Sequence, residues 1–330
     1  MAACGILSSD DPPELEPGPR NYEWTVDTLH SSPGGFIFDI WGSSPDDVWA
    51  VANTGINNLW HFNGEEWSVW PERVGSSFYS IYGFAQDDVW MGGNDGKLYH
   101  FDGEEWSQPY IFESKGLNGV RVNDIWGTSD ANLYAIGTAT QEQGSFLVSF
   151  ILHYDGNNWH ELLVTDFGVQ FQQIRIEKGT PYIRAQKYNH ATSDTLLFYQ
   201  YLNNDVKELL SKADSEVYSM TLNDIGGCIY YYVDNSILAF NDKDLKEILS
   251  FSNTDLIIRI DGLHENDLFL HTRDKTLHYN GENEKSLLEG LPRNVFRAQL
   301  FSEEVFFVIW DVNNGTTLVY HGKLNEQKEE

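Results

Sequence analysis

Four histidines recur at one position of a repeated sequence pattern: His61, His100, His153 and His278. Imidazole is a common ligand of Zn²⁺, so a set of four histidines suggests a metal site. Each histidine, however, belongs to a different copy of the repeat, and equivalent positions of a repeat array do not converge on one point. We therefore expect no metal site here, and we predict that each histidine makes a structural hydrogen bond within its own copy.

Two pairs of acids, Asp46-Asp47 and Asp87-Asp88, lie in turns of the first two copies. Carboxylates often cap turns, and oxygen ligands also suit Ca²⁺. The D-x-D-x-D-G loop that is typical of calcium sites is absent, so the sequence predicts no cofactor. Calcium is the one metal that these turns would suit.

A second repeated position holds a polar residue between apolar neighbours. Its two arginines suit an anion or carboxylate ligand, and its two aspartates offer the pair of carboxylates that a glycoside-cleaving enzyme needs. The structural alternative is a ring of hydrogen-bonded, hydrated side chains. The position is occupied in turn by Asp39, Ser80, Asp124, Gln173, Ser219, Arg259 and Arg297.

The repeat that carries these positions is clearest in residues 38–67, returns in 79–106, and recurs in stretched form in 123–159. Short alternating runs separated by Gly, Asn and Asp indicate strands and turns. An aromatic residue of the second strand marks seven copies, at Trp49, Trp90, Tyr134, Tyr182, Tyr230, Phe269 and Phe306. The spacing of about 43 residues is that of a four-stranded β-propeller blade. The sequence thus predicts an all-β, seven-bladed propeller, with the polar position around its central channel and Arg259 and Arg297 brought beside Asp39 by closure.

The ends of the chain predict how the ring closes. The last copy lacks a fourth strand, whereas residues 22–29 (YEWTVDTL) form a spare one that resembles residues 65–72. We expect this segment to pair with the strand near 317–321, because closure removes an exposed sheet edge. Residues 1–21, rich in Pro, Gly and acids, are predicted to be a flexible tether, residues 22–330 the propeller, and 323–330 a disordered tail.

Blades three and four carry the longest connections, at 138–148 and 186–195, and the connection 108–119 that enters blade three is also extended. Loops between the second and third strands of a blade and loops between blades emerge on the same side of a propeller. We therefore expect a raised rim there that binds a ligand. The predicted rim residues are Tyr110, Phe112, Phe146, Tyr188 and His190.

The net charge of −29 argues against nucleic acid as a partner, because such a surface repels phosphate backbones. No apolar run approaches the ~20 residues that a membrane-spanning helix requires. Contact with a membrane is therefore expected only through a lipid, and the protein is expected to be a monomer.

The I-W-G-x-S-x-x-D-V-W-A-V and H-[FY]-[ND]-G-x-x-W elements of residues 36–159 resemble secreted bacterial β-propellers, a group whose members mostly lack an assigned activity. This resemblance implies the fold and export rather than a reaction. The opening M-A-A-C-G followed by an acidic segment resembles the processing site of a bacterial lipoprotein. That resemblance implies a lipid on Cys4 and a location in the outer membrane, at the cell surface or in the periplasm.

Two functions are consistent with these patterns. The first is a non-catalytic binding or scaffold module on the cell envelope, which recognises a protein or a glycan through one face. The alternative is a carbohydrate-active enzyme, of glycosidase or lyase type, with Asp39 and Asp124 at the channel mouth.

Overall fold

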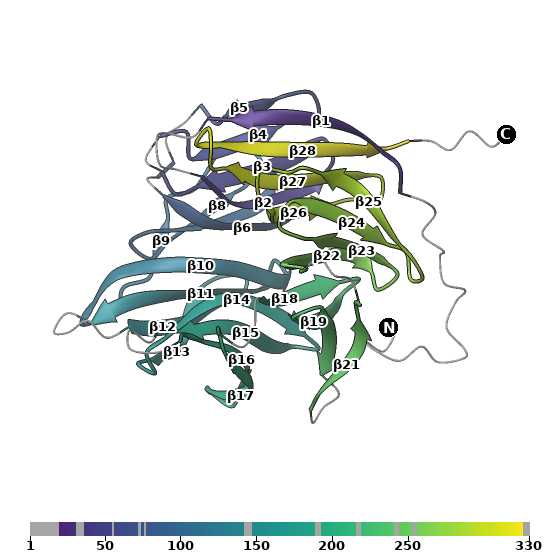
Figure 1. Ribbon diagram of the computed structural model, residues 1–330. Helices are drawn as coiled ribbons and strands as arrows, with labels where there is room; N and C mark the ends of the chain where they lie inside the picture. Colours follow the sequence, from purple (N-terminus) through teal and green to yellow (C-terminus); the bar gives the residue numbers. More distant parts are fainter. Residues whose placement is uncertain are drawn as a thin grey trace. The chain divides into compact units, whose positions relative to one another are not determined.

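The computed structural model describes residues 20–30, 36–54, 56–71, 74–75, 77–141, 147–188, 193–215, 219–240, 244–252 and 256–325. In this part of the chain every regular element is a strand, and the strands form seven four-stranded sheets. The fold is the seven-bladed β-propeller that the repeat predicts (Figure 1). None of the described segments is a helix that could span a membrane.

The chain divides into two compact units, which are described separately. The four-blade unit comprises residues 29–216 and 315–317 and holds the first four sheets in chain order. Its strands are β2 (Ile37–Ser44), β3 (Asp47–Ala52), β4 (Leu59–Phe62), β5 (Trp67–Val69), β6 (Phe78–Ala85), β7 (Asp88–Gly93), β8 (Lys97–Phe101), β9 (Tyr110–Ile111), β10 (Leu117–Ser129), β11 (Asn132–Gln141), β12 (Leu147–Tyr154), β13 (Trp159–Thr165), β14 (Val169–Glu177), β15 (Thr180–Lys187), β16 (Thr195–Leu202) and β17 (Asp205–Ala213).

The three-blade unit comprises residues 1–28, 217–314 and 318–330. Its strands are β18 (Met220–Ile225), β19 (Cys228–Val233), β20 (Ser236–Phe240), β21 (Leu245–Ser250), β22 (Arg259–His264), β23 (Asp267–His271), β24 (Lys275–Tyr279), β25 (Glu284–Glu289), β26 (Val295–Leu300), β27 (Glu304–Asp311), β28 (Thr316–Leu324) and β1 (Tyr22–Leu29). In both units each aromatic residue that marks a copy of the repeat lies in the second strand of its sheet, as predicted.

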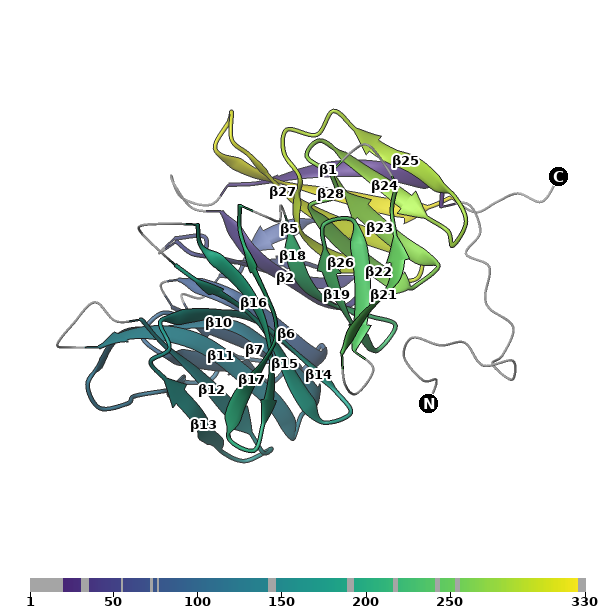
Figure 2. The ribbon, with the colours of Figure 1, turned by 60° about the horizontal axis from the view of Figure 1, so that its bottom comes forward.

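The N-terminal strand completes the last blade. The sheet order is β1-β28-β27-β26, and β1 lies beside β28 in both ribbon views (Figure 1; Figure 2). Trp24 packs on Phe307 with ring centroids 5.6 Å apart. It also covers Gly322, where a Cβ atom would come within 2.7 Å of the indole. The predicted closure is therefore confirmed, and Gly322 is small because the closing tryptophan lies over it.

Both predicted boundaries of the propeller need correction. Arg20, assigned to the tether, forms an ion pair with Asp267 of β23. At the other end, β28 continues to Leu324, and the Asn325 N–H donates a hydrogen bond to the carbonyl of Asn21 at 2.8 Å. Residues 323–325 are thus part of the last blade rather than of a tail, because pairing with the opening segment extends the sheet. Residues 1–19, with Cys4, and 326–330 lie outside the described residues.

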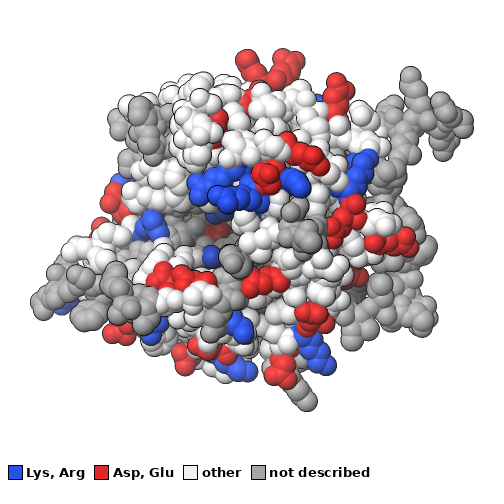
Figure 3. All heavy atoms as spheres, viewed as in Figure 1, with Lys and Arg blue, Asp and Glu red and all other residues white. Residues whose placement is uncertain are grey.

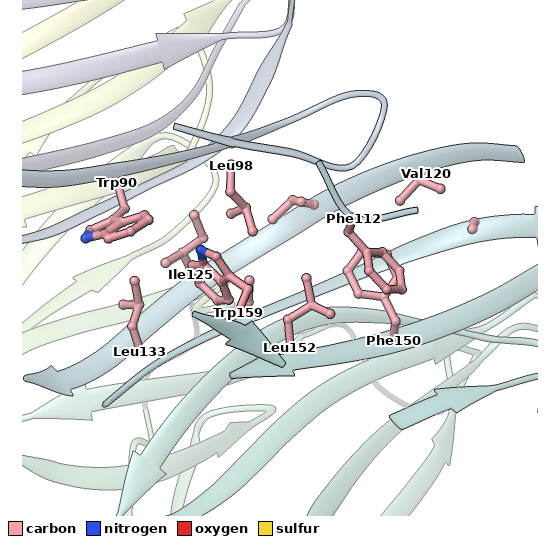
Figure 4. Close-up of a cluster of buried hydrophobic side chains, with 12 residues drawn as sticks. Trp90, Leu98, Phe112, Val120, Ile125, Leu133, Phe150, Leu152 and Trp159 are labelled. Atoms are coloured by element: carbon pink, nitrogen blue, oxygen red, sulfur yellow. The ribbon is translucent and has the colours of Figure 1, made fainter. Parts of the chain in front are cut away.

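Aromatic residues of one blade pack into the next within the four-blade unit. A Cβ atom on Gly83 would lie 2.7 Å from the Trp41 ring of the preceding blade, which explains the glycine of the I-W-G element. The Tyr82 hydroxyl donates to the Gly127 carbonyl of the following blade at 2.9 Å. Figure 4 shows the buried side chains that fill the space between blades two and three, among them Trp90 and Phe112.

Candidate functional site

Each repeat histidine is held inside its own blade. His61 Nε2 lies 2.7 Å from Asp47 Oδ1, and its ring stacks on Trp49 with centroids 4.1 Å apart. His100 bonds to Asp88 at 2.8 Å in the same way. The equivalent contacts are His153 with Asn132 at 2.9 Å, His278 with Asp267 at 2.7 Å, and His321 with Glu304 at 2.6 Å. The predicted structural hydrogen bond within each blade is confirmed, and the described residues contain no metal-binding group of three or more His, Cys, Asp or Glu side chains.

In the four-blade unit the polar repeat position joins one blade to the next. Asp39 Oδ2 accepts the Ile81 N–H at 3.0 Å, and Ser80 Oγ accepts the Ile125 N–H at 2.8 Å. Asp124 Oδ2 accepts the corresponding N–H of blade four, from Ile174, at 2.7 Å, and it also pairs with Arg175 at 2.9 Å. Gln173, half-buried in β14, occupies this position in the fourth blade.

These contacts favour the structural interpretation of the polar position. A carboxylate that acts as nucleophile or general base must be accessible to substrate. Asp39 and Asp124 already accept backbone hydrogen bonds, and Asp124 is 9% exposed with its charge balanced by Arg175.

The polar position differs in the three-blade unit. Ser219 Oγ donates to the Ile258 carbonyl. Arg259 pairs with Asp261, whose carboxylate also lies 3.2 Å from the buried His271. Burial opposes ionisation of Asp261, but Arg259 and His271 outweigh it and lower the pKa of that carboxyl. Because Asp261 already balances Arg259, an anion site on this arginine is disfavoured. Arg297 donates to the Phe296 carbonyl at 3.0 Å and lies 4.4 Å above the Phe296 ring.

A β-bulge precedes the polar position in each blade of the four-blade unit. The register shifts between Ile37 and Asp39, and equivalently in the next three blades. A bulge inserts one residue that opposes no partner and turns its side chain out of the regular alternation. The inserted residues, which we call the bulge row, are Phe38, Tyr79, Asn123 and Gln172, and all four are partly exposed.

Side-chain contacts connect the bulge row from blade one to blade three. The Phe38 and Tyr79 rings meet edge to face with centroids 4.9 Å apart. The Arg121 guanidinium lies 4.8 Å above the Tyr79 ring, a distance typical of a cation–π contact. Arg121 also donates to Asn123 Oδ1 at 2.6 Å. Among the residues that the structure describes, Arg121 forms no ion pair with a carboxylate.

The row continues into blade four through amide groups. Asn123 Nδ2 donates to the Phe171 carbonyl at 2.7 Å. Gln172 Nε2 donates to Gln186 Oε1 at 3.0 Å, and Arg184 donates to Gln172 Oε1. The row is therefore aromatic at blade one, cationic over an aromatic ring at blades two and three, and rich in amides at blade four.

Of the five predicted rim residues, two are exposed as expected. Tyr110 of β9 is 38% exposed, and its ring stacks on Trp159 with centroids 6.2 Å apart. Burial, reinforced by Glu161, raises the pKa of Tyr110. Tyr188 is 47% exposed and donates to Gln170 Oε1 at 2.7 Å, next to the blade-four end of the bulge row. Phe146 and His190 lie outside the described residues.

The prediction for Phe112 is wrong. This ring is 3% exposed and packs against Phe150 with centroids 4.6 Å apart (Figure 4). The connection that enters blade three turns Phe112 into the space between two blades, where burial of its apolar surface stabilises their contact. It is a core residue and cannot contact a ligand.

The same connection does contribute to a pocket, of about 570 Å³, at the edge of blade three. Leu117 pairs with Gln141, so the pocket lies where β10 begins and β11 ends. Apolar side chains meet a few polar ones there, as is usual in a ligand pocket. The pocket is lined by Ser114, Lys115, Gly116, Leu117, Gln141, Val148, Val164 and Asp166.

The bulge row is absent from the sequence-predicted site residues, although it has a signal in the sequence. In the first four copies an aromatic or amide residue directly precedes the polar repeat position, and strict alternation would put that side chain on the opposite face of the strand. One such residue is not enough to predict a bulge. The bulge row is identified from the shifts of register between the paired strands.

The fold and these contacts define a seven-bladed β-propeller in which several blades carry a histidine bonded to an acid or an asparagine, and in which partly exposed polar and aromatic side chains lie at the bulges of the four-blade unit. No family model and no curated protein matches the sequence. Among solved structures, the chain is similar to "YCF48 bound to D1 peptide", with a TM-score of 0.61 and 15% identity over 92% of this chain and 97% of that one. It is also similar to YCF48 from Cyanidioschyzon merolae, with a TM-score of 0.59 and 13% identity over 90% and 98% of the two chains. At these identities the likeness supports the fold alone.

Proposed function

We propose that this protein is a peptide-binding propeller, which recognises an extended segment of a partner protein on the bulge row of its four-blade unit. The observation that carries this proposal is the series of contacts from Phe38 through Tyr79, Arg121 and Asn123 to the Phe171 carbonyl, directly before Gln172. Four blades contribute to it, so a ligand several residues long would contact all of them.

The chemistry of the row suits a polypeptide. The Phe38 and Tyr79 rings offer an apolar surface for a ligand side chain, and aromatic residues often supply most of the energy of an interface. A side-chain amide both donates and accepts hydrogen bonds. Both N–H groups of the Asn123 and Gln172 amides are already donated within the protein, but each side-chain oxygen accepts only one bond there and keeps a lone pair for an N–H group of a ligand main chain. The similar propeller YCF48 has been solved bound to a peptide, which is consistent with this class of partner.

A position on the bacterial envelope would give such a module access to exported or membrane-inserted partners. This part of the proposal rests on the resemblance of the opening residues to a lipoprotein processing site. The acidic surface is compatible with it, and Figure 3 shows that basic side chains are interspersed among acidic ones on the face in view.

The proposal is tested by selecting peptides from a random display library on the purified full chain, and by measuring their affinity for two variants. Tyr79→Ser and Arg121→Gln should each weaken a selected peptide about thirtyfold, the effect of losing an interface hot spot of about 2 kcal/mol. The exposed Arg293 lies in the other unit, and Arg293→Gln should change nothing. Peptides that bind all three variants equally, or a glycan that binds the row when no peptide does, would refute the peptide assignment.

A further inference from the structure

A second pocket, of about 460 Å³, lies in the three-blade unit where the described chain begins and ends. Arg20, Tyr22 and Trp24 contribute from the closing strand β1 and the residues before it. The outer strand β25 of the preceding blade forms the other wall. The lining residues are Arg20, Asn21, Tyr22, Trp24, Lys285, Ser286, Leu287 and Asn325.

The charge of this lining is positive. Two of its residues are basic, and no carboxylate is among them. The Arg20 charge is balanced by the buried Asp267. Lys285 Nζ donates to the neutral side chain of Asn21, and in the described part of the chain this lysine has no ion pair. One cationic charge therefore remains available, in a protein that carries 50 acidic and 21 basic residues.

Tyr22 lines the pocket with its ring rather than with its hydroxyl. Its side chain is 9% exposed, its hydroxyl oxygen is fully buried, and the Arg20 guanidinium interacts with that oxygen. Burial raises the pKa of Tyr22 to about 12 against the opposing charge of Arg20, so the hydroxyl keeps its proton at neutral pH. Arg20 is therefore engaged by Asp267 and Tyr22, and Lys285 is the cation left to meet an anionic ligand.

The remaining walls are apolar. The Trp24 ring is half-buried and packs on Tyr22 with centroids 5.3 Å apart, and Leu287 of β25 is partly buried. Aromatic side chains of this kind bind flat or apolar bodies well. The volume lies within the usual range for small-molecule sites.

From the pocket, the cation and the aromatic wall together, we propose that this site binds a small ligand with an oxyanion, a carboxylate or a phosphate, on a flat apolar body. Lys285 donates to the oxyanion, and Trp24 packs against the body. Hydrogen bonds to an ionised acceptor are roughly twice as strong as neutral ones. A ligand with an oxyanion should therefore bind more tightly than a neutral analogue of the same shape.

The test uses the full chain and three probes: benzoate, phenyl phosphate and the neutral benzyl alcohol. Binding is followed through the NMR signal of the Trp24 indole N–H, which is assigned by its absence in Trp24→Phe. We expect a saturable shift with benzoate or phenyl phosphate and none with benzyl alcohol. The probe that binds more tightly identifies the oxyanion as carboxylate or phosphate.

Variants separate binding from folding. Lys285→Gln should lower the affinity about tenfold. Lys246→Gln should leave it unchanged, because Lys246 holds the equivalent register position on the outer strand β21 of another blade. Absence of a saturable shift up to about 10 mM of either anion, or equal losses in both lysine variants, would overturn the proposal and leave the peptide site of the other unit untouched.

Discussion

Removal of the Ser80 hydroxyl should destabilise the four-blade unit. Ser80 is fully buried, and its Oγ accepts the Ile125 N–H of the next blade at 2.8 Å. In Ser80→Ala that N–H loses its acceptor, and water cannot replace it because Ile125 is 2% exposed. A buried donor left without a partner costs about 1–3 kcal/mol. We therefore expect the free energy of unfolding to fall by about 2 kcal/mol.

The assay is urea unfolding, with Ser107→Ala as the matched control. Ser107 Oγ also accepts a backbone N–H, that of His100 at 3.1 Å, but this bond is exposed. Water replaces the lost acceptor there, so the control should stay within about 0.5 kcal/mol of the parent protein. The slope of the free energy against urea should not change, because neither variant alters the surface buried on folding.

Hydrogen exchange locates the effect. In Ser80→Ala the Ile125 amide should exchange faster than in the parent protein, while the amides of the three-blade unit should keep their rates. Equal stability of the two alanine variants, or an unchanged exchange rate at Ile125, would refute the view that the polar repeat position ties one blade to the next.

Three further predictions concern other parts of the molecule. Gly83→Ala should cost about 1–3 kcal/mol in the same urea assay, because the new methyl group would meet the Trp41 ring, and a loss below 0.5 kcal/mol would contradict this packing. Burial lowers the pKa of His321 more than Glu304 raises it, so the unfolded chain binds this proton at a higher pH than the folded one. Stability should then fall as pH drops below about 7, by up to about 1.4 kcal/mol per pH unit for this group. His321→Gln should make that fall less steep, and parallel pH curves for variant and parent would refute the assignment. Finally, the proposed lipid thioether on Cys4 leaves that sulfur unable to form a disulfide with Cys228, the other cysteine of the sequence. The intact mass of the exported full chain, measured without reductant, should therefore be raised by a lipid rather than lowered by the two hydrogens that a disulfide removes.

The architecture was predictable because every blade repeats the same local constraints. A second-strand aromatic such as Trp49 recurs because a large apolar side chain fills the interior of each blade, and it stacks on the histidine where the blade has one. The closing strand was predictable from a simple mismatch, since the last copy lacks one strand and residues 22–29 supply one. The pairing of Asn325 with Asn21 was not predictable, because short polar segments at a chain end carry no alternation that distinguishes a strand from a tail.

The candidate site was less accessible from sequence. Phe112 lies in an extended connection with other apolar and polar residues, and nothing in that composition indicates that its ring turns inward to Phe150. The bulge row depends on a shift of register, which is a property of two paired strands rather than of either sequence alone. The pocket at Tyr22 depends on a contact between segments that lie about 260 residues apart in the chain.

In this protein, a position that recurs with the same side chain indicates a role in folding, whereas a position that recurs with different side chains is free to serve ligand binding. His61 and His100 recur with the same kind of partner in successive blades, and a group that stabilises its own blade cannot distinguish one ligand from another. At the bulges the backbone irregularity recurs while the side chain changes, from Phe38 in blade one to Gln172 in blade four. In the four-blade unit, a backbone feature that all four blades share therefore displays a side chain that folding does not fix. Selection for a ligand acts most freely at such positions, and this is why the bulge row, rather than the repeated histidines or the polar repeat position, is the surface on which specificity is expected.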